Sequence, residues 1–281
     1  MSRIPGGSLR TFFVLTYAVT WTCFISLATL VVSTRTPVGA LVVLLGVFAP
    51  GLVALSLTAR AEGGQGVRAL LGRILRWRVA AHWYLFAAGY IAAIKLTVAL
   101  VHRVATGVWP PFGHEPWYLI VGAIVVSTPV QAGEEIGWRG YVLPRLTRRF
   151  GLARASILLG VIWAGWHLPQ FFIPDSDTYG QSFFVFVLQV TALSVAMAWL
   201  YAHTNGSLLL VMLMHAAVNN SKDIVPSAVP GATNPLGLNA SLVAWLTVTL
   251  LWICAAYFLA RMRGWDPRGD IGASHLPRSA A

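Results

Sequence analysis

Long apolar stretches separated by short polar connections dominate the pattern of this chain. A bilayer core about 30 Å thick requires roughly 20 apolar residues in a helix. Eight stretches meet or approach this length. They are residues 12–32, 38–58, 83–101, 117–143, 155–172, 183–201, a stretch that begins near 207, and 242–259. The pattern predicts an all-α, polytopic membrane protein with about eight transmembrane helices in a single domain, 1–281.

Composition supports this class and excludes others. Hydrophobic residues make up 57% of the chain and charged residues 10%, whereas a soluble domain has about 25% charged residues. The two cysteines, Cys23 and Cys254, lie inside apolar stretches, which argues against a disulfide scaffold. The first apolar stretch is longer than the ~7–15-residue core of a signal peptide, so we expect it to be retained as a span.

The basic residues predict the orientation. If the N-terminus is placed in the cytoplasm, the connections on the opposite side hold only Arg35, Arg103 and Lys222. Nearly all other basic residues then fall in cytoplasmic connections and tails. This is the positive-inside distribution, and it places both termini in the cytoplasm, at the plasma membrane if the source is bacterial. The excess of 20 Lys+Arg over 9 Asp+Glu is therefore explained by topology. We expect membrane lipids as partners, and no nucleic acid.

Three local features lie outside the main spans or interrupt them. Residues 67–80 repeat apolar positions at helical spacing, which indicates either a helix at the inner membrane surface or a basic linker. Residues 261–281 are polar and rich in Pro and Gly, and we expect a flexible tail. Lys95 falls within the third span, and we expect its side chain to extend toward the outer surface.

Two glutamates and two histidines inside the spans require an explanation, because a charged group there costs about 2.5–3.5 kcal/mol to insert. They are Glu134, Glu135, His167 and His215. Measured along each helix from the nearest cytoplasmic connection, Glu134, His167 and His215 lie about 16, 20 and 15 Å deep. Three separate helices thus bring a glutamate and two histidines to a similar depth, which predicts a shared site.

Helical spacing assigns different roles to the two acids. Glu135 and Arg139 are four residues apart, so they can pair on one helix face. Glu134 points elsewhere, and we expect it to face a cavity. The alternative is that both acids share Arg139 as a structural support. His215 and Asn219 are also four residues apart and lie on one face of their helix.

Trp163 and His167 repeat the four-residue spacing on another helix. Pro169 follows closely, and proline ends or kinks a helix. We expect this interruption to open room beside His167.

These residue types predict hydrolysis of an amide bond. A glutamate and a histidine in a low-dielectric cavity can activate a water as general base, and a second histidine with an asparagine amide can stabilise the oxyanion that develops. The trio Glu134, His167 and His215 also offers ligands for zinc, with a position left for catalytic water. Whether the site binds a metal ion stays open. The HExxH motif is absent, which excludes a zincin-type site.

The motifs resemble those of the CPBP family of intramembrane proteases, which includes the CAAX prenyl endopeptidases and bacterial proteins tied to bacteriocin processing or immunity. The family's EExxxR motif is matched at 134–139, and its HxxxN motif at 215–219. Its FxxxH motif is matched at 163–167 with Trp163 in place of phenylalanine. The resemblance covers about 117–221.

The resemblance implies an eight-helix membrane fold whose cavity opens to the cytoplasm. It implies that Glu134 and His167 activate water while His215 and Asn219 stabilise the oxyanion. Glu135, Arg139 and Trp163 would support them. We expect an intramembrane endopeptidase that acts either on CAAX-type substrates or on leader peptides. Its substrate would be a peptide or protein that reaches the membrane, with or without an attached lipid. We favour a site without tightly bound metal, with a divalent ion such as zinc as the alternative.

Two other functions remain open. The chain could be a non-catalytic immunity or scaffold protein that retains the site. It could also be a proton-coupled transporter, because buried Glu, His and Lys95 can form a proton relay. The absence of inverted-repeat symmetry in the hydropathy pattern argues against the transporter.

Overall fold

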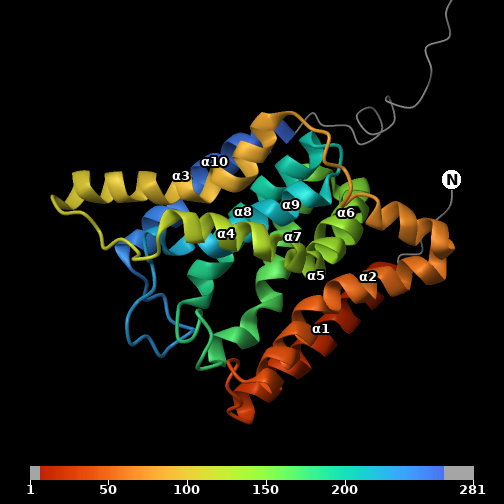
Figure 1. Ribbon diagram of the computed structural model, residues 1–281, viewed down its shortest axis with the longest axis horizontal. Coiled ribbons are helices and arrows are strands. Elements are labelled where there is room, and N and C mark those ends of the chain that lie inside the picture. The colour runs from red at the N-terminus through yellow and green to blue at the C-terminus, as the bar shows by residue number, and fades with distance from the viewer. Residues whose placement is uncertain (1–6, 263–281) are drawn as a thin grey trace, which may run out of the picture.

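The computed structural model describes residues 7–262, whose regular secondary structure is all helical, without a strand (Figure 1). The longer helices are α1 (Gly7–Thr29), α2 (Pro37–Leu71), α3 (Ala81–Thr106), α4 (Trp117–Ser127), α6 (Leu143–Phe150), α7 (Leu152–Trp166), α8 (Phe183–His203), α9 (Leu208–Ser221) and α10 (Leu242–Met262). The short helices are η1 (Thr128–Gln131), α5 (Ala132–Glu135), η2 (Ile136–Val142), η3 (Leu168–Phe172) and η4 (Lys222–Ile224). The prediction of an all-α membrane protein is confirmed.

Within the described residues, seven helical stretches are long and apolar enough to cross a membrane. The eighth predicted span is α9, which has only 14 residues and is therefore about 21 Å long. It packs against α3, α4 and α8, and most of its residues are buried. Because protein rather than lipid surrounds α9, it does not need the full length of a lipid-exposed span.

The fourth span is an unbroken helical stretch that changes its winding. Helix α4 tightens into the 3₁₀ helix η1, continues as α5, widens into the π-helix η2 and ends as α6. Pro129, near the start of η1, has no amide hydrogen to donate to the helix. Glu134 and Glu135 lie in α5, and Arg139 lies in η2. π-Helical turns inside helices frequently mark functional sites.

Glycines let α2 approach α5 and η2 closely. A Cβ atom at Gly137 would lie 2.6 Å from Cβ of Pro50, and one at Gly51 would lie 2.8 Å from the carbonyl oxygen of Gly133. Small residues at such crossings allow the two backbones to pack directly against each other. This close packing fixes the position of the segment that carries Glu134.

The predicted surface helix over 67–80 is wrong beyond Leu71. Helix α2 breaks at Gly63, which has a φ of 63°, and then resumes as far as Leu71. Arg73 turns inward, and its Nη1 donates to the carbonyl oxygen of Gly140 at 2.8 Å and to the hydroxyl of Tyr201 at 2.9 Å. These contacts hold the connection between α2 and α3 against the helix bundle. The predicted C-terminal tail lies outside the described residues, apart from Arg261 and Met262.

The expectation for Lys95 is also wrong. Its side chain is buried, with an exposed fraction of 3%, and Nζ donates to the carbonyl oxygen of Val225 at 3.1 Å and to Oγ of Ser227 at 3.4 Å. The segment that follows η4 folds back over α3 and supplies these acceptors. Lys95 therefore finds its partners inside the protein and does not extend to the membrane surface.

Candidate active site

Glu135 lies at the centre of a buried polar cluster. Its Oε1 accepts from Nη1 of Arg139 at 2.9 Å and contacts Nδ1 of His215 at 2.7 Å. All three side chains are at most 5% exposed. The predicted Glu135–Arg139 pair is present. Among the described ion pairs Arg139 has Glu135 as its only acidic partner, which argues against the interpretation that it is shared with Glu134.

Glu134 is held by a tryptophan from another helix. Nε1 of Trp163 donates to Oε2 of Glu134 at 2.8 Å. Cζ of Arg139 lies over the same indole, 4.0 Å from the ring centroid, a cation–π arrangement. Trp163 therefore orients one acid through its N–H group and covers the cation that neutralises the other acid.

His167 lies at the end of α7, where the helix gives way to η3. Pro169 is in the first turn of η3, so the predicted interruption is present. Nδ1 of His167 lies 2.8 Å from the carbonyl oxygen of Trp163. A carbonyl oxygen only accepts, so Nδ1 carries the hydrogen. The neutral ring then has its lone pair on Nε2, where it can accept a proton.

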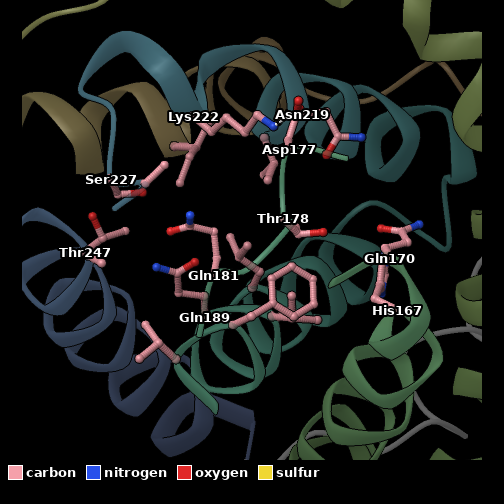
Figure 2. A pocket seen from close by; sticks show the side chains of 18 of the residues that line it. His167, Gln170, Asp177, Thr178, Gln181, Gln189, Asn219, Lys222, Ser227 and Thr247 are labelled. Atoms are coloured by element: carbon pink, nitrogen blue, oxygen red, sulfur yellow. Dashed lines mark hydrogen bonds and ion pairs between the residues drawn. The ribbon is translucent and has the colours of Figure 1, made fainter. Parts of the chain in front are cut away.

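One cavity of about 720 Å³ brings the predicted residues together. Its lining includes Glu134, Trp163, His167, His215 and Asn219. Figure 2 shows His167 and Gln170 on one wall and Asn219 on another, around the same space. Asn219 is exposed to this space, and its side chain has no hydrogen-bond partner among the described residues. The two supporting charges, Glu135 and Arg139, lie behind the wall.

The cavity also contains polar groups that the sequence interpretation missed. Gln170, Gln181 and Gln189 line it. Gln189 lies within the apolar stretch of α8, and a neutral polar residue in such a stretch was a signal for a lining position. Apolar side chains, among them Phe186 and Leu193, form the rest of the wall.

The predicted zinc ligands do not form a ligand set. Within residues 7–262 no three His, Cys, Asp or Glu side chains are grouped so that they could hold a metal ion. Nδ1 of each active-site histidine is engaged, with Trp163 or Glu135, which leaves Nε2 as the free ring nitrogen.

Comparison with known proteins bears on this arrangement. Residues 112–221 match the model of a family described as type II CAAX prenyl endopeptidase Rce1-like. All three motifs lie within the match. The match agrees with the resemblance of these motifs to the CPBP family. The CPBP motifs thus coincide with the residues that line or support the cavity.

A curated relative agrees with the family match. CAAX prenyl protease 2 of Methanococcus maripaludis is 31% identical over 98 residues. The aligned segment covers 33% of this chain and 36% of that protein. The chain therefore matches only about a third of this relative's length.

Proposed function

We propose that this chain is an intramembrane endopeptidase in which Glu134 and His167 activate water. The observation that carries the proposal is the convergence of three helices on one cavity. Glu134 from α5, His167 from the end of α7 and His215 from α9 all line it. The match of residues 112–221 to the model of a protease family supports the interpretation.

Glu134 is suited to receive a proton. Trp163 occupies one of its carboxylate oxygens, which leaves the other oxygen for a water in the cavity. The hydrogen bond from Nδ1 of His167 leaves Nε2 of that ring as a second acceptor. A water placed between these two groups would lose a proton as its oxygen attacks the scissile carbonyl. General-base help of this kind contributes about 10²–10⁴-fold to a rate.

His215 and Asn219 would stabilise the negative charge that develops on the attacked carbonyl oxygen. The carboxylate of Glu135 orients the ring of His215, because its Oε1 accepts from Nδ1. When that ring is protonated, Nε2 carries a hydrogen as well. Nε2–H of His215 and the amide of Asn219 can then both donate to the oxyanion. Removing one such donor typically costs about 10²–10³-fold in kcat.

The proton taken from water returns to the leaving group. As the tetrahedral intermediate collapses, the C–N bond breaks, and the acid form of Glu134 or His167 donates its proton to the departing amine. The products are a carboxylic acid and an amine. No other reactant is needed, because water supplies both the hydroxyl group and the proton.

The substrate we propose is a peptide or protein segment that reaches the membrane. The apolar wall formed by Phe186, Leu193 and their neighbours can accept apolar side chains or a lipid group. The relative's name as a prenyl protease supports a CAAX-type substrate with a prenyl group, and leader-peptide processing is the other substrate class we consider.

The test compares wild type, Glu134→Gln and Glu115→Gln in detergent, with each matched by thermal melting. Glu115 is exposed and outside the cavity lining, so its variant controls for loss of one negative charge. The substrates are a peptide panel that includes farnesylated C-terminal tetrapeptides, and mass spectrometry identifies the cut. We expect Glu134→Gln to reduce cleavage by about 10²-fold or more and Glu115→Gln to leave it unchanged. Equal cleavage by all three proteins would refute the mechanism.

A further inference from the structure

Two connections between helices are joined to each other at one end of the bundle. The connection from α2 to α3, residues 72–80, lies beside the connection from α8 to α9 (Figure 1). The amide of Leu208 donates to the carbonyl oxygen of Arg73 at 3.0 Å. Oγ of Ser207 donates to the carbonyl oxygen of Arg76 at 2.7 Å. These hydrogen bonds fix the backbone of one connection against the other.

A pocket of about 440 Å³, which we call the arginine pocket, lies between the two connections. Its lining includes Arg76 and Arg78 from the first connection and Thr204 and Asn205 from the second. Among the described residues, no Asp or Glu lines it, and none lines both this pocket and the active-site cavity. The arginine pocket is therefore positively charged and separate from the candidate active site.

The guanidinium of Arg76 is held in place in this pocket. Its Nη1 donates to the carbonyl oxygen of Asn205. Gly206 follows with a φ of 71°, and a Cβ atom there would lie 3.3 Å from Nη1 of Arg76. The glycine thus leaves room for the guanidinium. Because a guanidinium carries five N–H donors, the bond to Asn205 leaves other donors for a ligand.

The positive charge of the first connection is not balanced by an acid within the described residues. Arg73, Arg76 and Arg78 lie close together in the sequence, and none of them belongs to a described ion pair. Arg73 donates to neutral oxygens, those of the Gly140 carbonyl and the Tyr201 hydroxyl. An anionic ligand would supply the negative charge that these three arginines lack.

Two exposed apolar side chains lie beside these charges. Leu75 and Trp77 both line the arginine pocket, and they are 76% and 58% exposed. Cζ of Arg78 lies 5.2 Å from the centroid of the Trp77 ring, so a cationic and an apolar group are adjacent. Tryptophan is typical of the interface between membrane and water. A free phosphate ion would leave Leu75 and Trp77 uncovered, whereas a phospholipid would also cover them.

The arginine pocket lies at the level of lipid head groups. The helices α2, α3 and α8 are each long and apolar enough to cross a membrane, so the connections between their ends lie near its surface. Basic pockets between transmembrane helices bind anionic head groups. We propose that the arginine pocket binds an anionic phospholipid. Arg76 and Arg78 contact its phosphate, and Leu75 and Trp77 contact its acyl chains.

Lipid binding to the full chain in a non-ionic detergent tests this proposal without any need for turnover. The protein is titrated with phosphatidylglycerol, and native mass spectrometry gives the number of bound lipids and the apparent Kd. The Tm is measured in parallel, because a ligand that binds the folded state raises it. Phosphatidylcholine, which has no net charge, and inorganic phosphate, which has no acyl chains, are titrated in the same way. We expect phosphatidylglycerol to bind more tightly than either.

Two double variants locate the bound lipid. Arg76→Gln with Arg78→Gln removes two charges from the arginine pocket. Arg148→Gln with Arg149→Gln is the matched control, because these arginines are exposed and outside the pocket lining. We expect the first double variant to raise the Kd for phosphatidylglycerol about 5-fold for each arginine removed, and the control to leave it nearly unchanged. Arg76→Lys with Arg78→Lys retains the charges and should retain most of the binding.

Three results would overturn the proposal. Equal binding of phosphatidylcholine would mean that the arginines do not select an anionic lipid. Equal binding of inorganic phosphate would indicate an ion site in place of a lipid site. Equal weakening in both glutamine double variants would mean that binding is spread over the basic surface. If Arg76→Gln prevents folding, Arg78→Gln is compared with Arg149→Gln, because no hydrogen bond within the described chain engages the side chain of Arg78.

Discussion

His215 and Glu135 are joined by a contact of 2.7 Å between Nδ1 and Oε1, although they are 80 residues apart in the sequence. The same carboxylate oxygen also accepts from Nη1 of Arg139. Glu135 thus connects Arg139, four residues later in the same helical stretch, to His215 from α9. Because Nδ1 of His215 is held, its Nε2 is the ring atom available to the cavity.

Replacing Glu135 should therefore destabilise the protein as well as slow the reaction. Glu135→Gln leaves the guanidinium of Arg139 buried without a counter-charge, and breaking a buried pair in this way typically costs about 3–5 kcal/mol. We expect a large drop in Tm in detergent. Glu62→Gln is the matched control, because it breaks an exposed pair with Arg145 that is worth about 0–1 kcal/mol. Similar small shifts for both variants would contradict the assignment.

A double variant separates the structural role of Glu135 from its positioning of His215. Glu135→Gln with Arg139→Met removes the unpaired charge and should recover much of the lost stability. Hydrolysis should remain low, because His215 has lost its carboxylate partner. Recovery of activity together with stability would mean that Glu135 serves the fold alone.

Trp163→Phe should reduce hydrolysis with little effect on folding. Phenylalanine keeps an aromatic ring against Arg139 but loses the N–H group that donates to Glu134. A hydrogen bond to a charged group is worth about 1.5–3 kcal/mol, so we expect a loss of at least roughly tenfold in kcat/KM. Trp252→Phe is the control, since its indole donates to Leu188 outside the cavity lining. Equal rates for the two variants would exclude a role for the Trp163 hydrogen bond.

The parts of the fold that the sequence predicted are those governed by local physics. Bilayer thickness sets the length of an apolar stretch, so the membrane spans could be predicted from the sequence. Glu135 and Arg139 are four residues apart, and their pairing depends only on helical geometry, so this ion pair could be predicted too. The similar depths of Glu134, His167 and His215 followed from counting residues along three helices.

The parts that the sequence did not predict depend on how distant segments pack. The contact of Glu135 with His215 depends on how α5 and α9 are oriented relative to each other. The partners of Lys95 come from a segment 130 positions later in the chain, which folds back over α3. The lining of the cavity likewise combines residues from distant loops and helices, and neither residue types nor spacing encode that arrangement.

Gly137→Ala should destabilise the junction between α2 and η2. The new methyl group would lie 2.6 Å from Cβ and 2.7 Å from the carbonyl carbon of Pro50. Backbone atoms cannot move aside cheaply, and overpacking of this kind costs typically 1–3 kcal/mol. Gly122→Ala on α4 is the control, because a Cβ there meets no atom within 4 Å. We expect a lower Tm for Gly137→Ala alone, and equal melting of both variants would contradict the close packing.

Lys95→Met should loosen the segment at 225–241 that covers one side of the cavity. The change removes the donor to Val225 and Ser227 and keeps the apolar stem of the side chain. Hydrogen exchange measured by mass spectrometry should become faster in this segment, since local opening there would cost less free energy. Lys222→Met is the matched control, because it removes an exposed ion pair with Asp177 that contributes little. Unchanged exchange at 225–241 in Lys95→Met would show that Lys95 does not anchor this wall, and its charge would then need another role in the cavity.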